Sequence, residues 1–90
     1  APDPSTPQGL RDRAILEFAY ATGLRASELS GLTLARVDFS LGYVRIKGKG
    51  ERERVVPIGR LALDALEEYL LKARPVFLKR GQDPHVFLSR

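Results

Sequence analysis

The sequence predicts an α+β fold made of two N-terminal helices, a small three-stranded antiparallel sheet and a further helix. Apolar residues recur at spacings of three and four in two separate stretches, about residues 10–21 and 62–70, which is the period of amphipathic helices. Between these stretches, residues 43–47 alternate between apolar and polar side chains, as a strand with one buried face does. The period therefore changes from helix to strand and back to helix along the chain.

The composition is that of a small globular domain. The chain has 90 residues, enough for one such domain or part of one. Its 43% hydrophobic and 29% charged residues argue against disorder. No apolar run approaches the length of a membrane span, and no signal peptide opens the chain. The absence of cysteine excludes disulfides and thiolate metal sites, and it fits a reducing, cytoplasmic location.

The charge balance favours an anionic partner. The formal net charge is +4 and the pI is about 9.9. Arginine supplies 11 of the 15 basic residues, and its planar guanidinium suits bidentate contacts with phosphate. Solvated surface charge with no partner explains the same excess equally well. The chain contains no methionine, so we expect a piece of a longer protein.

The first elements are two helices. Residues 1–6, with two prolines, are expected to form a linker-like lead-in. Thr6 and Pro7 are the N-cap and first helical residue of the first helix, whose apolar positions face a core. Gly23 ends this helix. A second helix is expected over about residues 25–31.

The sheet and the last helix follow. Strands are expected over residues 37–39, 43–47 and 54–58, with a turn at residues 40–42 and a charged loop at residues 48–53. Pro57 restricts the third strand to an edge or a strand end. The last helix should cover about residues 60–73, with Pro75 just beyond its end. Residues 85–88 are expected to form a short extended segment.

The first candidate site lies at the start of the second helix. Arg25 follows a helix-ending glycine, and Glu28 stands three residues later. This spacing predicts that the Glu28 carboxylate holds the Arg25 guanidinium, while the first amides of the helix favour an anion. A positioned arginine beside free amides suits a phosphate. A plain surface ion pair, contributing about 0–1 kcal/mol, explains the pattern as well.

The second candidate site is the loop between the last two strands. Lys49 stands between Gly48 and Gly50, which allow close approach of the backbone to a ligand and projection of the lysine from a hairpin tip. Such a lysine enters a DNA groove or gives a proton to a leaving oxygen. A solvated turn of alternating charges is the alternative reading.

Other reactive residue types carry no assignment. His85 is the only histidine and lacks the spacing of a metal ligand, so we expect it to be structural or exposed. Tyr20, Tyr43 and Tyr69 are possible nucleophiles by type. Each stands where helix packing or a strand face would explain it.

Two segments together resemble the catalytic domain of tyrosine recombinases, in the Xer and phage-integrase-like branch. The first resembles the family's opening catalytic box, and the second resembles its hairpin with the catalytic lysine. The order and separation of the boxes also match the family, and the resemblance covers about 80 of the 90 residues. The segments are residues 21–29 with 31–33 and 37–38, and residues 46–58.

The resemblance implies roles for the residues of the first box and for the loop lysine. Arg25 matches the first catalytic arginine, which contacts the scissile phosphate and stabilises its charge in the transition state. Glu28 matches the position that supports this arginine. Lys49 matches the hairpin lysine, which protonates the departing 5′ oxygen and reaches the minor groove.

The resemblance also covers the remaining basic residues of the hairpin. Lys47 is the nearest rival of Lys49 for the catalytic role. Arg52 and Arg54 match basic positions of the family, with phosphate contact or hairpin support as their implied roles. Lys47, Arg52 and Arg54 are therefore the expected DNA-binding residues.

The chain departs from the family pattern at its end. The family completes its site with a histidine-x-x-arginine box and a nucleophilic tyrosine, whereas His85 has Leu88 three residues on. We therefore expect residues 7–90 to be the N-terminal part of a catalytic domain, inactive alone and weakly DNA-binding. The nucleophile is expected outside the chain.

The resemblance implies partners as well as residues. The parent protein would cleave and rejoin double-stranded DNA through a 3′-phosphotyrosine, together with other protomers and without metal or nucleotide cofactor. Two other classes remain open at this point, a small non-catalytic DNA-binding module and a plain interaction domain.

Overall fold

A computed structural model describes the chain except for residues 1–2, 4, 49, 51, 79–82 and 89–90. Helices α1 (Pro7–Thr22) and α2 (Ala26–Ser30) lead through a 3₁₀ turn, η1 (Leu34–Arg36), into the sheet. Its strands are β1 (Val37–Asp38), β2 (Tyr43–Lys47) and β3 (Glu53–Pro57). Helix α3 (Arg60–Glu68), the π-helical turn η2 (Tyr69–Ala73) and α4 (Arg74–Phe77) follow. The predicted α+β fold is confirmed.

Helix α1 begins and ends at the predicted residues. The Thr6 hydroxyl accepts a hydrogen bond from the Gly9 amide at 3.0 Å, and Pro7 occupies the first helical position. Gly23 has a φ of 71°, a conformation that favours glycine, and its amide donates to the Ala19 carbonyl at 2.8 Å. In the described lead-in, Asp3 accepts hydrogen bonds from the amide and hydroxyl of Ser5.

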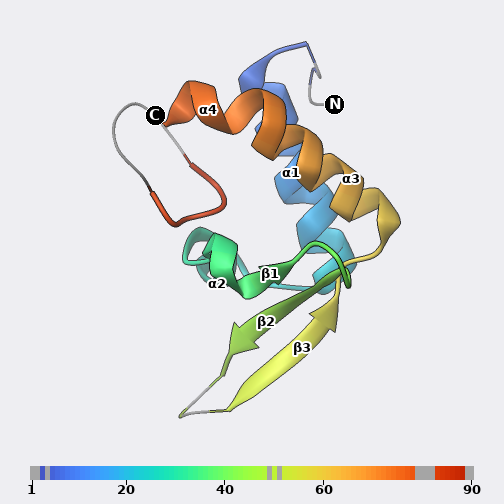
Figure 1. The fold of residues 1–90 in the computed structure, drawn as a ribbon, viewed down its shortest axis with the longest axis vertical. Helices are drawn as coiled ribbons and strands as arrows, with labels where there is room; N and C mark the ends of the chain where they lie inside the picture. Colours follow the sequence, from blue (N-terminus) through green and yellow to red (C-terminus); the bar gives the residue numbers. More distant parts are fainter. Residues whose placement is uncertain (1–2, 4, 49, 51, 79–82, 89–90) are drawn as a thin grey trace.

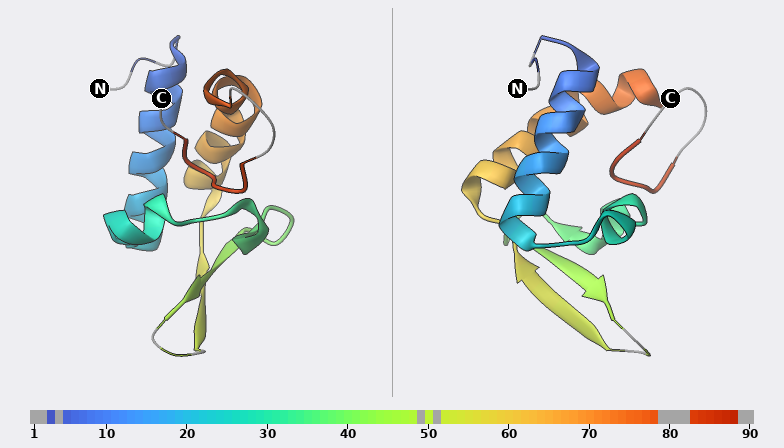
Figure 2. Two further views of the ribbon diagram at one scale, coloured as in Figure 1. Left: turned by 90° about the vertical axis from the view of Figure 1, so that its left-hand side faces the viewer. Right: turned by 180° about the vertical axis from the view of Figure 1, so that it is seen from behind.

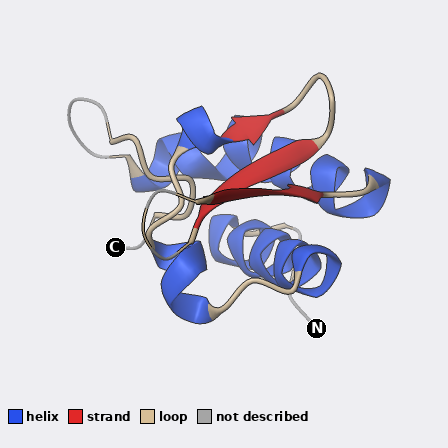
Figure 3. Cartoon of the chain, turned by 90° about the horizontal axis from the view of Figure 1, so that it is seen from below, coloured by secondary structure: helices blue, strands red, loops and turns tan. Residues whose placement is uncertain are grey.

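The sheet has the expected antiparallel order β1-β2-β3. Val44 and Ile46 of β2 are buried, while Arg45 and Lys47 are exposed, as the alternation predicts. The β2–β3 pairing sets Ile46 opposite Arg54 and Lys47 opposite Glu53. The hairpin projects away from the helices (Figure 1, Figure 2). In a view from the hairpin side of the molecule, the sheet lies in front of the helices (Figure 3).

The core lies between α1, α3 and the sheet. Helices α1 and α3 run side by side (Figure 1), and their apolar faces meet the buried face of β2. Phe87 packs against Phe18 and Tyr69, with ring centroids 5.9 and 5.7 Å apart. The buried hydrophobic residues are Leu10, Ala14, Phe18, Leu24, Leu29, Leu32, Val37, Val44, Ile46, Ile58, Ala62, Ala65, Leu66, Tyr69, Ala73, Phe77, Val86 and Leu88.

The last helix does not end before Pro75 as predicted. The chain stays helical to Phe77, with Pro75 in the first turn of α4. Proline has no amide to donate, and its ring collides with the carbonyl four residues earlier in a regular helix. The π-helical turn resolves this conflict, because the Arg74 amide bonds to the Tyr69 carbonyl five residues back and widens the turn ahead of the proline.

The segment after α4 returns to the core. Residues 85–88 were expected to be extended, and His85 among them forms a β-bridge. Thr33 and His85 form an antiparallel bridge, flanked by hydrogen bonds from the Leu34 amide to the Pro84 carbonyl and from the Val86 amide to the Leu32 carbonyl. Residues 83–88 are thus joined to the chain between α2 and η1.

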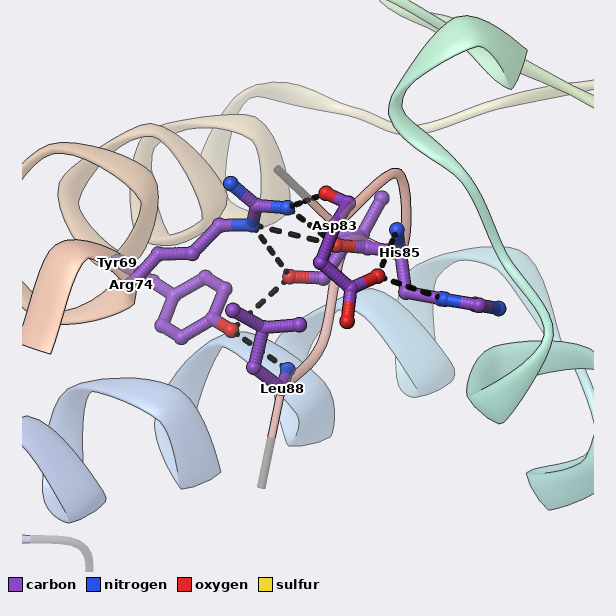
Figure 4. Close-up of polar contacts among 6 residues, drawn as sticks. Tyr69, Arg74, Asp83, His85 and Leu88 are labelled. Carbon is purple, nitrogen blue, oxygen red and sulfur yellow. Dashed lines mark hydrogen bonds and ion pairs between the residues drawn. The ribbon is translucent and has the colours of Figure 1, made fainter. Parts of the chain in front are cut away.

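Two side chains clamp this segment (Figure 4). The Tyr69 hydroxyl donates to the Val86 carbonyl and accepts from the Leu88 amide, both at 2.9 Å. The Arg74 guanidinium donates to the carbonyls of Asp83, His85 and Val86. Burial raises the pKa of the Tyr69 hydroxyl. Both hydrogen-bonding directions of that hydroxyl are therefore used in holding the fold.

One expectation about the tyrosines is wrong. Tyr20 does not pack in the helix interface, because its side chain is 95% exposed on the solvent face of α1. The α1 pattern placed Ala21 toward the core as well, yet it is exposed. Ala19 and Ala21 are small enough to leave the helix face ambiguous in sequence, and only Leu10, Ala14 and Phe18 settle its orientation.

Candidate functional site

Arg25 is held at the surface by its neighbours. Gly23 reverses the chain after α1, and the buried side chains of Leu24 and Leu29 anchor the backbone on either side. Arg25 is the N-cap residue of α2, in extended conformation, and its side chain is exposed. Among the described residues its guanidinium forms no ion pair, so the charge is available to a ligand.

Glu28 supports Arg25 differently from the prediction. Its Oε1 accepts a hydrogen bond from the Arg25 backbone amide at 2.9 Å, and its Oε2 faces the Nη2 atom of Arg54 at 3.3 Å. The carboxylate therefore holds the Arg25 backbone and not its guanidinium. The reason is that a glutamate three residues after the N-cap folds back onto the free N-cap amide.

The helix that follows Arg25 is shorter than predicted. Helix α2 has five residues, fewer than the predicted seven-residue span of 25–31. The Arg25 amide is occupied by Glu28, and the Gly31 amide already closes the helix onto the Ser27 carbonyl.

The hairpin carries the other candidate residues. Its loop is closed by a 2.7 Å hydrogen bond from the Gly48 amide to the Arg52 carbonyl, and Gly50 has a φ of 71°. Lys49, the predicted catalytic lysine, lies outside the described residues. Lys47 and Arg52 are exposed on either side of the loop.

Arg54 and Glu53 connect the loop end of the hairpin to the rest of the molecule. Arg54 reaches Glu28 of α2, and Glu53 forms an ion pair with Arg36 of η1. Successive strand residues point to opposite faces, so the two ion pairs leave β3 on opposite sides. The structure thereby brings Arg25, Glu28 and Arg54 together, and leaves Arg52 apart from them.

A groove separates α2 from the hairpin and holds basic residues that the sequence analysis did not assign. Arg45 donates to the Ala35 carbonyl at 2.9 Å, and Arg36 reaches the groove from η1. The strand alternation already set Arg45 beside Lys47 on one face, whereas the place of Arg36 depends on η1 and had no signal in the sequence. The lining residues are Ser27, Glu28, Gly31, Leu32, Thr33, Arg36, Arg45, Ile46 and Lys47.

His85 takes part in a local turn, and no metal-binding group surrounds it. Its Nδ1 lies 2.8 Å from Asp83 Oδ1, which also accepts from the His85 amide at 2.9 Å. These hydrogen bonds hold the pKa of Asp83 below its usual value. Over the part of the chain that is described, three or more metal-ligating side chains nowhere gather. Nor is any described helix long and apolar enough to cross a membrane.

The comparisons with known proteins identify the family. The model of the phage integrase family matches residues 1–90. The chain therefore belongs to the phage integrase family. Within it, the chain is similar to tyrosine recombinases of the Xer type, so the predicted resemblance is confirmed.

Two sequence relatives and one solved structure show the extent of this similarity. Over 89 residues the chain is 46% identical to tyrosine recombinase XerD of Halalkalibacterium halodurans, covering 99% of the chain and 30% of the relative. Over 75 residues it is 57% identical to tyrosine recombinase XerC of Pelotomaculum thermopropionicum, covering 83% and 24%. The crystal structure of XerA recombinase aligns with a TM-score of 0.73 and 27% identity, over 89% of this chain and 28% of that one. The chain spans about 30% of the length of the curated relatives it matches.

Proposed function

We propose that the chain is the N-terminal part of the catalytic domain of a site-specific tyrosine recombinase, which cleaves and rejoins double-stranded DNA. The observation that carries this proposal is the double engagement of Glu28. Its carboxylate joins the backbone of Arg25 to Arg54 near the loop end of the hairpin, so the two boxes that resemble the family lie side by side. Family membership and the XerA-like fold support the same function.

In this function Arg25 binds the scissile phosphate. Its exposed guanidinium donates to the non-bridging oxygens and stabilises the negative charge that grows on them in the transition state. Glu28 fixes the backbone from which this side chain projects. An arginine whose backbone is held in advance loses less entropy on binding the phosphate.

The hairpin supplies the remaining groups of the chain. We assign Lys49 as the acid that protonates the departing 5′ oxygen. Lys47 and Arg52, exposed beside the loop, are assigned to DNA phosphates. Arg54 contacts a phosphate or supports the hairpin. The projection of the hairpin away from the helices suits insertion into a DNA groove (Figure 1).

The reaction is a transesterification that needs no metal or nucleotide cofactor. A tyrosine hydroxyl gives its proton to a base outside these 90 residues as its oxygen bonds to phosphorus. The bond to the 5′ oxygen breaks, and that oxygen takes a proton from Lys49. The 3′-phosphotyrosine is itself a phosphodiester, so the free 5′ hydroxyl can attack it and rejoin the strand by the same steps in reverse. We place the attacking tyrosine outside these 90 residues, because the family's nucleophile follows a histidine-x-x-arginine box that these residues do not contain. Tyr69 in addition is buried, and both its hydrogen bonds hold the fold. The proposed partners are DNA and further protomers, in the cytoplasm.

The test is single-turnover cleavage by a full-length recombinase that carries these residues. Arg25→Ala should lower the cleavage rate at saturating protein by about 100- to 1,000-fold, the usual effect of removing a transition-state donor. DNA affinity should fall only severalfold. Lys72→Gln, which removes an exposed charge from the η2 turn, is the matched control and should leave both quantities unchanged. A loss of affinity in proportion to charge, with no loss of rate, would instead indicate a non-catalytic DNA-binding module.

A further inference from the structure

The hairpin is tied to the arginine-bearing helix through one carboxylate. Glu28 Oε1 accepts from the Arg25 backbone amide, and Glu28 Oε2 pairs with the Arg54 guanidinium. Arg25 and Arg54 are 29 positions apart in sequence, yet only the Glu28 carboxylate stands between the backbone of one and the side chain of the other. A change in the orientation of the hairpin therefore reaches Arg25 directly.

Arg54 is placed for this contact by the register of the sheet. It pairs with Ile46, so its side chain leaves β3 on the same face as Ile46, which is buried. Lys47, by contrast, pairs with Glu53 and projects from the opposite face. Among the basic residues of the hairpin that are described, Arg54 thus points toward α2 while Lys47 points away from that face.

The Arg54 guanidinium already forms an ion pair with the Glu28 carboxylate. A guanidinium paired with a carboxylate must give up that contact before it can bind a phosphate. Arg52 carries the same charge two residues away, and it has no ion-pair partner among the described residues. The two arginines therefore differ in what they can offer to DNA, although both match basic positions of the family.

The pair is too exposed to act mainly through stability. The Arg54 side chain is 56% exposed and that of Glu28 is 26% exposed, and ion pairs at such positions contribute little to stability. We therefore expect the Arg54–Glu28 ion pair to act by positioning the hairpin and Arg25, and not by stabilising the fold. Reacting groups tolerate little displacement, and a shift of about 1 Å can lower a rate by about 100-fold.

A second ion pair adds to this geometric restraint. Arg36 of η1 pairs with Glu53, the residue before Arg54, on the other side of β3. The loop end of the hairpin is thus tied on two sides, to α2 and to η1. These two ion pairs leave adjacent residues on opposite faces of β3, so together they restrain the hairpin on both faces.

We propose that Arg54 is a positioning residue that sets the hairpin relative to Arg25 through Glu28, and not a DNA-phosphate contact. This inference rests on the proposed function, since the hairpin and Arg25 must act on one phosphate. Its effect belongs to the cleavage step, and DNA binding is governed by the free cations of the hairpin.

A double-variant cycle in the full-length recombinase tests this coupling. Glu28→Gln keeps an amide oxygen for the Arg25 backbone and removes only the ion pair, and Arg54→Gln removes the same pair from the other side. Each should lower the single-turnover cleavage rate by roughly tenfold. The double variant should be no slower than either single variant, because the pair is already lost. Arg54→Lys, which keeps a cation, should retain most of the rate.

Arg52→Gln is the matched control on the same hairpin. It should weaken DNA affinity and lower the salt slope of binding by about 0.9, the value for one phosphate contact. Arg54→Gln should change neither by more than a fraction of this, and it should leave the melting temperature unchanged. Multiplying rate losses in the double variant, or an affinity loss for Arg54→Gln equal to that of Arg52→Gln, would overturn the inference. If the unsubstituted protein cleaves no DNA, the proposed function fails and the inference falls with it.

Discussion

At the residue scale, Tyr69 carries a potentially reactive hydroxyl whose hydrogen bonds hold the fold. Its hydroxyl is buried, donates to the Val86 carbonyl and accepts from the Leu88 amide. Its ring also contacts Phe87. Removal of the hydroxyl leaves the buried Leu88 amide without its partner and takes one of two donors from the Val86 carbonyl, which keeps its hydrogen bond from Arg74.

Tyr69→Phe should therefore destabilise the protein by about 1–3 kcal/mol, the cost of leaving buried polar groups unsatisfied. Tyr20→Phe is the control, because Tyr20 is 95% exposed and should change stability by less than about 0.5 kcal/mol. Urea unfolding of the two variants and the unsubstituted protein measures the difference. Equal stabilities for both variants would contradict the assignment of Tyr69 as a structural residue.

At the element scale, the boundary between α1 and α2 decides where Arg25 lies. Gly23 has a φ of 71°, and an added Cβ there would meet nothing within 4 Å. The cost of any other residue is therefore backbone strain and not steric conflict. Gly31, at the end of α2, has a φ of −92°, and an added Cβ would meet only the Ser27 carbonyl oxygen at 3.5 Å.

Gly23→Ala should accordingly cost roughly 1–2 kcal/mol, the penalty of a left-handed conformation for a residue with a Cβ. Gly31→Ala adds the same methyl group in an allowed conformation and should be close to neutral. Thermal unfolding of both variants provides the comparison. The prediction is wrong if Gly31→Ala is as destabilising as Gly23→Ala.

At the scale of the whole molecule, the sequence predicted the elements better than the contacts between them. The Thr6 cap, the Gly23 stop and the alternation of residues 43–47 are local signals, and each is confirmed. Helix continuation through Pro75 was not predicted, because the π-helical turn that accommodates the proline has no local signal in the sequence. Local patterns specify local structure, and packing decides the rest.

In the candidate site, too, the sequence predicted the local features and not the long-range contacts. The spacing of Arg25 and Glu28 predicted that they interact, but not that the carboxylate would choose the backbone amide over the guanidinium. Its second oxygen is taken by Arg54, a residue 26 positions later whose approach depends on the register of β3. Contacts of this range have no signal in a single sequence.

The catalytic groups that we assign to this chain are Arg25 and Lys49, and the attacking tyrosine is assigned to another part of the protein. The most direct measurement is therefore identification of the tyrosine that becomes linked to DNA. A full-length recombinase carrying this chain is trapped on a nicked substrate, and the phosphotyrosyl peptide is located by mass spectrometry. We predict a tyrosine outside these 90 residues, and no nicking of supercoiled DNA by the 90 residues alone. A link at Tyr20, Tyr43 or Tyr69, or nicking by the isolated chain, would contradict the account.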